Sequence, residues 1–348
     1  MLFRKKREKI MIMPYRGYAS DKRLILRGRV LEDEVVSIRE EENLFHSLRN
    51  AYKRFESDEI PLAGLVAQYN GRTYQVTANK EGYFLFDIDI DEQLKDGESW
   101  NKIQLKVTTI PAHSNVVEQN ITATGEVMLP AKGASFGIIS DIDDTVLKTD
   151  VSHRLKLLRN TLLKSPFQRL PLPGVANWLK ALKAGKSGQD DNPIFYISKS
   201  PRNLYDYLAH FLALNNCPKG PILLRDIGWI RNDIRSKKNH HGHKKEEIIS
   251  ILETYPHLPF VFLGDIAGKD PEIYNSIRTS YKERVLAIFI RDIAHKKKQK
   301  LYRTWINSNG IDDIHLIRDS VSGAKYSLHH GLITPSAYRE IQEVLHHP

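Results

Sequence analysis

The sequence has very little cysteine and no long apolar run. Among its 348 residues there is one cysteine, Cys217, which excludes an internal disulfide and favours a reducing compartment. No apolar stretch approaches the length that spans a bilayer. The apolar stretch from Ile10 to Met13, which follows the first basic residues, is too short for a signal peptide. These absences predict a cytoplasmic protein.

Basic residues exceed acidic ones, and the formal net charge is +10. The positive charge is concentrated in residues 4–9, 154–169, 231–245 and 295–303. Such clusters favour anionic partners, which include nucleic acid, anionic lipid and phosphorylated substrates. Charge alone does not choose among these partners, and a solvated surface is the alternative explanation for any single cluster.

The hydrophobic pattern predicts a β-rich first half. Residues 1–20 are interpreted as a basic N-terminal arm, and residues 21–130 as a β-sandwich domain with one helix at about 42–56. The expected strands of the sandwich are short, alternating and separated by turn signals. They lie near 23–31, 63–69, 72–78, 83–90, 102–110 and 120–129.

The pattern changes at Phe136. Apolar runs then alternate with helical stretches, which is the βαβ rhythm of an α/β protein with a doubly wound parallel sheet. The runs lie at 136–140, 194–198, 221–224, 259–263 and 285–290. Residues 131–348 are therefore expected to form one catalytic domain.

A cluster of polar residues follows the first of these runs. Asp141, Asp143 and Thr145 come directly after the predicted strand, where open α/β sheets bind ligands. Two carboxylates so close repel each other unless a cation lies between them, and oxygen ligands at a strand end suit Mg²⁺. A calcium-binding loop is excluded, because Val146 and Ser152 occupy the positions that require glycine and glutamate. A solvent-exposed acidic loop remains the alternative.

Three further signals fall where the predicted sheet brings them to this cluster. Ser198 ends the second apolar run, and Lys244 opens an amphipathic helix. Asp265 ends a later run after Gly264, and Asp270 follows five residues on. Singly, these residues have simpler explanations as a turn residue, a surface charge and helix caps. Their order, each after a strand or at a helix start, favours one shared site.

In this order the residues resemble the four motifs of the haloacid dehalogenase superfamily. Four longer segments narrow the resemblance to the catalytic domain of the actin-patch phosphatidate phosphatase family, over residues 130 to 295. These segments are Ser140–Thr145, Tyr196–Tyr205, Gly220–Asp226 and Lys269–Tyr274. The residues before them are similar, more loosely, to the β-domain that precedes this module in bacterial members.

The resemblance implies a role for each residue of the site. Asp141 would be the nucleophile that forms an aspartyl-phosphate, and Asp143 the general acid and base. Thr145 and Ser198 would bond the phosphoryl oxygens, and Lys244 would balance negative charge.

The resemblance also implies the metal and substrate ligands. Asp141, Asp143, Asp265 and Asp270 would hold Mg²⁺. Lys199 and Arg225 would bind substrate.

Two departures from the family pattern bear on substrate preference more than on activity. Ile266 and Ala267 stand where the family has Ser-Gly. Lys199 stands where Asn or Ala is frequent.

The sequence therefore predicts a Mg²⁺-dependent phosphatase that converts phosphatidate to diacylglycerol and phosphate. The alternatives are a phosphatase for soluble or protein phosphoesters and a non-catalytic membrane-binding scaffold. The expected partners are a phospholipid substrate and an anionic membrane surface, with peripheral membrane attachment; no nucleic acid is expected, and the sequence does not give the oligomeric state. Residues 153–164 place Leu155, Leu158 and Leu162 on one helical face, which suits either an interfacial helix or packing on the sheet.

Overall fold

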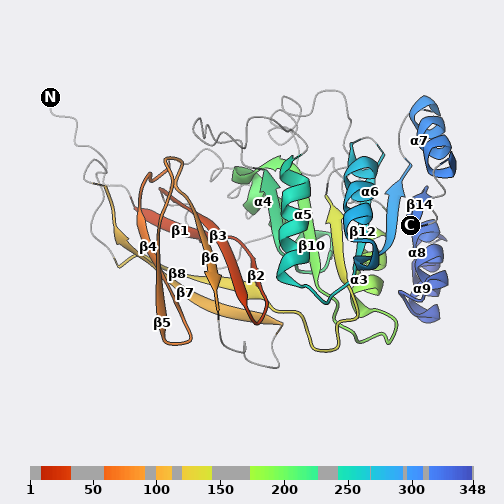
Figure 1. Ribbon diagram of the computed structural model, residues 1–348. Helices are drawn as coiled ribbons and strands as arrows, with labels where there is room; N and C mark the ends of the chain where they lie inside the picture. The colour runs from red at the N-terminus through yellow and green to blue at the C-terminus, as the bar shows by residue number, and fades with distance from the viewer. Residues whose placement is uncertain are drawn as a thin grey trace. The chain divides into compact units, whose positions relative to one another are not determined.

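The computed structural model describes residues 9–32, 59–90, 99–111, 120–142, 173–225, 242–266, 268–292, 296–308 and 313–346 (Figure 1). The predicted helix at 42–56, the segment 153–164, Asp143 and Thr145 lie outside these residues. The chain divides into two compact units. One comprises Met1–Pro130 with Asn203–His210, and the other Ala131–Arg202 with Phe211–Pro348.

The first unit is rich in β-structure, and the strands predicted between residues 23 and 129 are confirmed. The strands are β1 (Ile10–Pro14), β2 (Gly17–Ala19), β3 (Arg23–Glu32), β4 (Gly64–Tyr69), β5 (Arg72–Thr77), β6 (Tyr83–Asp89), β7 (Trp100–Thr109) and β8 (Thr122–Met128). They join in one hydrogen-bonded sheet in the order β1-β3-β2-β8-β7-β4-β5, with β6 paired to β3. The sequence predicted two facing sheets, whereas the described strands form one connected hydrogen-bonded network.

Alternation along the strands builds the core of this unit. In β6, Phe84, Phe86 and Ile88 are buried while the residues between them are exposed, as a strand with one face on a core requires. The strands β1 and β2 were not predicted, because residues 1–20 were interpreted as a basic N-terminal arm. Ile10 and Ile12 are buried in the same core as the later strands, but five- and three-residue strands are too short for a periodicity to be read.

The second unit is α/β and contains a parallel sheet. Its strands are β9 (Gly137–Asp141), β10 (Ile194–Pro201), β11 (Ile222–Arg225), β12 (Phe260–Asp265), β13 (Val285–Arg291) and β14 (Ile314–Ile317). All neighbouring pairs are parallel, and the order is β11-β10-β9-β12-β13-β14. The five predicted strands are confirmed, and β14 was not predicted. The strand order reverses between β9 and β12, which is where open α/β sheets form a ligand-binding crevice.

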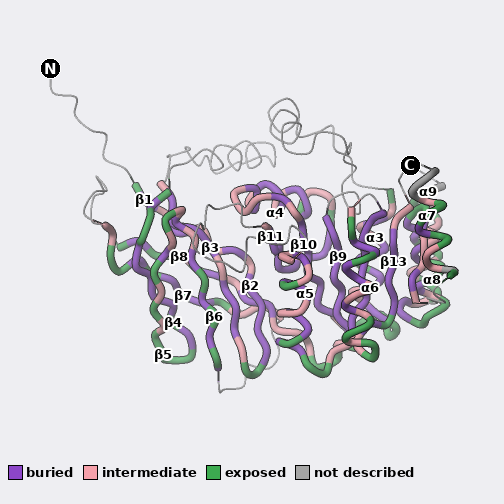
Figure 2. Tube along the Cα trace, turned by 45° about the horizontal axis from the view of Figure 1, so that its top comes forward, coloured by how far each residue is buried: buried purple, intermediate pink, exposed green. Residues whose placement is uncertain are grey.

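Helices alternate with these parallel strands along the chain, and the last two follow the final strand β14. They are α3 (Val175–Ala184), α4 (Tyr205–Leu214), α5 (Gly242–Thr254), α6 (Asp270–Ser280), α7 (Lys296–Ser308), α8 (Ser320–His329) and α9 (Pro335–His346), with 3-10 turns at Arg202–Leu204 and Lys282–Arg284. The helix α5 packs on β10 and β11, α6 on β12 and β13, and α8 on β14. Every residue of β9 and β12 is buried, as expected for parallel strands covered on both faces. Figure 2 shows the buried residues of β9 in purple. None of the helices in the described part of the chain is long and apolar enough to cross a membrane.

Candidate active site

Three polar side chains lie at the carboxyl ends of adjacent strands. Asp141 ends β9 and pairs in register with Ile197 of β10, so that Ser198 comes one residue beyond it. On the other side, Leu263 of β12 pairs with Ser140, which brings Asp265 to the same edge of the sheet. Asp141, Ser198 and Asp265 are all at least 97% buried. The sheet thus collects at one edge residues that lie up to 124 positions apart in sequence.

Lys244 connects two of the predicted acidic residues. Its Nζ lies 2.7 Å from Asp141 Oδ1 and 2.7 Å from Asp270 Oδ1, and all three side chains are buried. The sequence prediction that Lys244 opens a helix is confirmed, because α5 begins at Gly242. Burial acts to lower the pKa of Lys244, but the attraction of Asp141 and Asp270 outweighs it and raises this pKa well above the ordinary value. Lys244 therefore carries its positive charge at neutral pH.

The turn between β12 and α6 fixes the other two carboxylates. The backbone N–H of Gly268 donates to Asp265 Oδ1 at 2.7 Å. The backbone N–H of Asp265 donates to Asp270 Oδ2 at 3.3 Å. Asp270 opens α6 and is followed by Pro271, a residue suited to the first helical turn because it needs no hydrogen-bond partner for its nitrogen. Both carboxylates are oriented by the backbone, so their geometry is set before any ligand binds.

Gly264 allows α6 to approach the strand this closely. A Cβ built at Gly264 would lie 2.6 Å from Asp270 Oδ2 and 2.7 Å from Tyr274 Cε2. Both distances are shorter than real Cβ contacts. A glycine before Asp265 is therefore a packing requirement of the site.

Tyr274 is a site residue to which the sequence analysis gave no role. It lies four residues after Asp270 on α6, so both side chains share one helix face. The Lys244 Nζ lies 5.2 Å from the centroid of the Tyr274 ring, within the range of a cation–π contact. The hydroxyl donates to the Leu263 carbonyl oxygen at 2.9 Å, and burial raises the pKa of Tyr274 well above its usual value. Tyr274 thus remains a neutral phenol that helps to hold Lys244.

The donor set fits a divalent cation. Asp141, Asp265 and Asp270 each offer a carboxylate oxygen, and these oxygens lie within 4.8 Å of one another. Three buried carboxylates beside the single ammonium of Lys244 leave two negative charges unbalanced. A hard divalent cation with oxygen ligands, such as Mg²⁺, supplies that balance. The structure therefore brings together three of the four metal ligands predicted from the sequence.

The remaining predicted residues differ in how close they lie to this cluster. A Cβ built at Gly268 would be 3.3 Å from Lys199 Nζ and 3.8 Å from Asp265 Oδ1, so the Lys199 amine reaches the turn that holds Asp265. The Ser198 Oγ accepts a hydrogen bond from the Ser200 N–H at 2.9 Å. Arg225 ends β11, two strands from β9 at the same sheet edge, and is half-buried.

One departure from the family pattern can be placed. Ile266 follows Asp265 and is completely buried, so an apolar side chain fills the position where the family has a hydroxyl.

The second unit matches known proteins over most of its sheet. Residues 136–292 match the family model described as "Phosphatidate phosphatase APP1, catalytic domain". Phosphatidate phosphatase APP1 of Saccharomyces cerevisiae is 32% identical over 158 residues, which are 44% of this chain and 25% of that protein. An uncharacterized protein of Schizosaccharomyces pombe is 25% identical over 298 residues, which are 85% of this chain and 44% of that protein. The chain thus spans less than half the length of either relative. The matches confirm the resemblance predicted from the motifs.

Solved structures resemble this chain only weakly. A carbohydrate acetylesterase from Xanthomonas citri aligns over 87% of this chain and 76% of its own, with 10% identity and a TM-score of 0.28.

Proposed function

Residues 136–292 form a phosphatidate phosphatase-like catalytic domain, and from this we propose that the protein is a Mg²⁺-dependent phosphatase. It acts through an aspartyl-phosphate and hydrolyses phosphatidate to diacylglycerol and phosphate. The observation that carries the proposal is the position of Lys244 between Asp141 and Asp270, with Asp265 beside them. The strand order, numbered along this unit, is 3-2-1-4-5-6, which supports a doubly wound sheet of the haloacid dehalogenase type.

The first chemical step belongs to Asp141. One of its carboxylate oxygens attacks phosphorus, an O–P bond forms, and the bond to the ester oxygen breaks. Lys244 offsets the negative charge gathered by the carboxylate and the phosphoryl group. Ser198, at the end of β10, and Thr145 donate hydrogen bonds to the phosphoryl oxygens.

Proton transfer is assigned to Asp143, as the family resemblance implies. Asp143 gives its proton to the departing alkoxide, which leaves as the alcohol. It then takes a proton from water as that water attacks the aspartyl-phosphate. Inorganic phosphate departs, and the Asp141 carboxylate is restored.

The metal would be held by Asp141, Asp265 and Asp270, with the backbone carbonyl of Asp143. When bound, Mg²⁺ would supply positive charge that offsets the negative charge of the phosphoryl group. The turn hydrogen bonds to Asp265 and Asp270 hold these two ligands in place for it.

Phosphatidate is proposed as the substrate because the yeast relative carries that name. Lys199 reaches the Asp265 turn and suits an anionic headgroup, and Arg225 stands at the same sheet edge. We further propose that the protein is cytoplasmic and binds membranes peripherally, because its substrate would lie in a lipid surface.

The deciding experiment compares substrates under matched conditions. Phosphate release is measured from phosphatidate in mixed micelles and from soluble phosphomonoesters, each with Mg²⁺ or with EDTA. The proposal requires Mg²⁺-dependent release with a preference for phosphatidate. Release from soluble esters alone would instead identify a soluble phosphoesterase, and absence of release from every substrate would favour a binding protein.

A further inference from the structure

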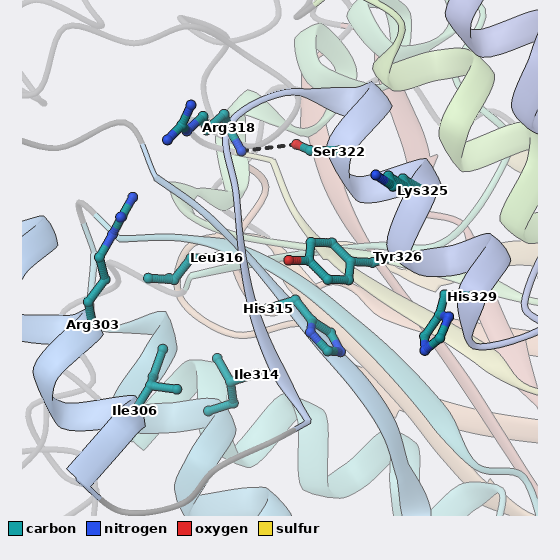
Figure 3. A pocket seen from close by; sticks show the side chains of 10 residues that line it. All are labelled: Arg303, Ile306, Ile314, His315, Leu316, Arg318, Ser322, Lys325, Tyr326 and His329. Atoms are coloured by element: carbon teal, nitrogen blue, oxygen red, sulfur yellow. Dashed lines mark hydrogen bonds between the residues drawn. The ribbon is translucent and has the colours of Figure 1, made fainter.

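A cavity lies at the far edge of the parallel sheet, away from the carboxylates. It has a volume of about 920 Å³ and is formed by α7, β14 and α8 (Figure 3). Cavities of 300–1,000 Å³ are typical of small-molecule sites. The lining contains three cationic side chains, Arg303, Arg318 and Lys325, and no carboxylate among the residues that the structure describes. We refer to it as the β14 groove.

Of the three cations that line the β14 groove, Arg303 alone has an acidic partner among the described residues. Arg303 is anchored by Asp292, with an Nη2–Oδ2 distance of 3.0 Å. Within the described part of the chain, Arg318 and Lys325 have no acidic partner, and both are exposed. In Figure 3, Arg303 from α7 and Arg318 from the end of β14 extend toward the same end of the groove. This end therefore attracts an anion.

The nearby carboxylates outside the lining are already engaged. Asp313 binds Arg278 with an Nη2–Oδ2 distance of 2.7 Å. Asp319 caps α8 by accepting from the Ser322 N–H at 2.7 Å. Among the described residues, neither forms an ion pair with Arg318 or Lys325.

The rest of the β14 groove is apolar or neutral. Ile306, Ile314 and Leu316 supply aliphatic surface, and Tyr326 projects between the two arginines and the histidines. His315 stacks on Tyr326, with ring centroids 4.7 Å apart and planes at 18°. Burial, with the nearby His330, lowers the pKa of His315 to about 4, so His315 adds no charge at neutral pH. A cationic end next to an aliphatic wall suits an amphiphilic ligand that has an anionic head and an apolar tail.

The cationic end faces the same edge of the sheet as the proposed active site. Arg318 directly follows β14, and Asp292, which holds Arg303, directly follows β13. Since all these strands are parallel, their carboxyl ends lie on the edge that carries Asp141 and Asp265. Neighbouring strands are about 4.8 Å apart, so β14 lies roughly 10 Å from β12.

We propose that the β14 groove binds the phosphate headgroup of an anionic phospholipid and thereby attaches the catalytic edge to a lipid surface. Arg318, Arg303 and Lys325 bind the headgroup, and Ile306, Leu316 and Tyr326 contact the glycerol and the first acyl carbons. Aliphatic lining favours lipid over nucleic acid, and His315 covers one face of the exposed aromatic ring on which a base would stack. The site is separate from the metal-binding carboxylates and does not depend on the proposed hydrolysis.

Vesicle binding of the full chain tests this proposal. The probe is vesicles of phosphatidylcholine with or without phosphatidylserine, which offers an anionic headgroup without being a phosphomonoester. The variant is Arg318→Gln with Lys325→Gln. Each basic residue near an anionic surface is worth roughly a fivefold change in partitioning, so the loss of two should lower binding about twenty-five-fold. Circular dichroism and thermal unfolding show that the variant is folded, and this check is independent of the proposed catalysis.

The matched control removes the same charge at the opposite edge of the sheet. Lys186 follows α3, and Lys282 precedes β13; both are exposed. Lys186→Gln with Lys282→Gln should leave vesicle binding unchanged. Equal losses in the two double variants, or no loss in either, would overturn the proposal, because binding would then reflect net charge or another surface.

A third variant tests the apolar wall. Tyr326→Ser should weaken binding to phosphatidylserine vesicles severalfold while leaving the charge unchanged. Unchanged binding, or a groove variant that loses affinity for an RNA oligonucleotide but not for vesicles, would contradict a phospholipid site.

Discussion

The Nζ of Lys244 lies 2.7 Å from a carboxylate oxygen of Asp141 and 2.7 Å from one of Asp270. Lys244, near the start of α5, thus links the end of β9 to the beginning of α6. Taking three charged groups out of water costs free energy that such contacts only partly recover. The arrangement is therefore better explained by chemistry than by stability, because in the proposed mechanism it would present two aspartates to a metal and a phosphoryl group.

Replacing the ammonium should disable catalysis without unfolding the protein. We expect Lys244→Met to lower kcat for phosphate release by about a hundredfold or more, the size typical of losing one group that stabilises transition-state charge. Steady-state kinetics measures this effect. Lys245→Met is the matched control, since Lys245 is the next residue of α5 and lies outside the cluster. Similar kcat values for the two variants would exclude Lys244 from the catalytic set.

Adding one methyl group at Gly264 should disrupt the metal site. In Gly264→Ala the new Cβ would collide with Asp270 Oδ2 and with the Tyr274 ring. We expect weaker Mg²⁺ binding and a loss of activity, because α6 must move away from β12. Gly133→Ala is the control, since a Cβ there meets nothing closer than 3.9 Å. If calorimetry gave the two variants the same Mg²⁺ affinity, the close packing at Gly264 would not shape the site.

Magnesium should stabilise the folded protein through Asp265. A cation that binds the folded but not the unfolded chain raises the free energy of unfolding, by about 2.7 kcal/mol at a hundred times its Kd. The melting temperature rises as a result. In Asp265→Asn the amide oxygen can still accept from the Gly268 N–H, but one negative charge is lost. We therefore expect the Mg²⁺-induced rise in melting temperature to disappear in this variant. Asp89→Asn, an exposed position on β6, should keep the full rise; if Asp265→Asn kept it too, this carboxylate would not be a ligand.

Acid should destabilise the chain in part through His315. The pKa of His315 is lowered from 6.5 to about 4 by burial and by His330. Between these values the unfolded chain binds more protons than the folded one, so the free energy of unfolding falls as the pH decreases through this range. His315→Phe should therefore lose less stability than the wild type between about pH 7 and about pH 5. Thermal unfolding at the two pH values measures the difference. Equal losses in variant and wild type would show that His315 does not titrate in this way.

The sequence predicted which residues meet at the candidate active site, because parallel strands end at the same edge of a sheet. Apolar runs such as 194–198 and 259–263 can only be buried parallel strands when helices separate them, and parallel strands end at the same edge. The polar residue that ends each run therefore meets its counterparts, as Asp141, Ser198 and Asp265 do.

Other features depend on packing that no short pattern encodes. The strand β14 has four residues and includes His315, so neither length nor alternation marked it. The role of Tyr274 depends on how closely α6 approaches β12, which only the contacts at Gly264 reveal. The β14 groove is lined by Arg303 of α7 and by Arg318, which follows β14. These residues are fifteen positions apart in sequence, and only the tertiary fold places both in one groove.

Phosphate release from phosphatidate by the wild type and by Asp141→Asn is the most direct test of the proposed function. The proposed mechanism predicts Mg²⁺-dependent release by the wild type. It also predicts that Asp141→Asn, which keeps the shape of the side chain but removes the attacking carboxylate, retains less than about a hundredth of wild-type kcat. Retention of more than that by a folded Asp141→Asn protein would contradict the assignment of Asp141 as the nucleophile.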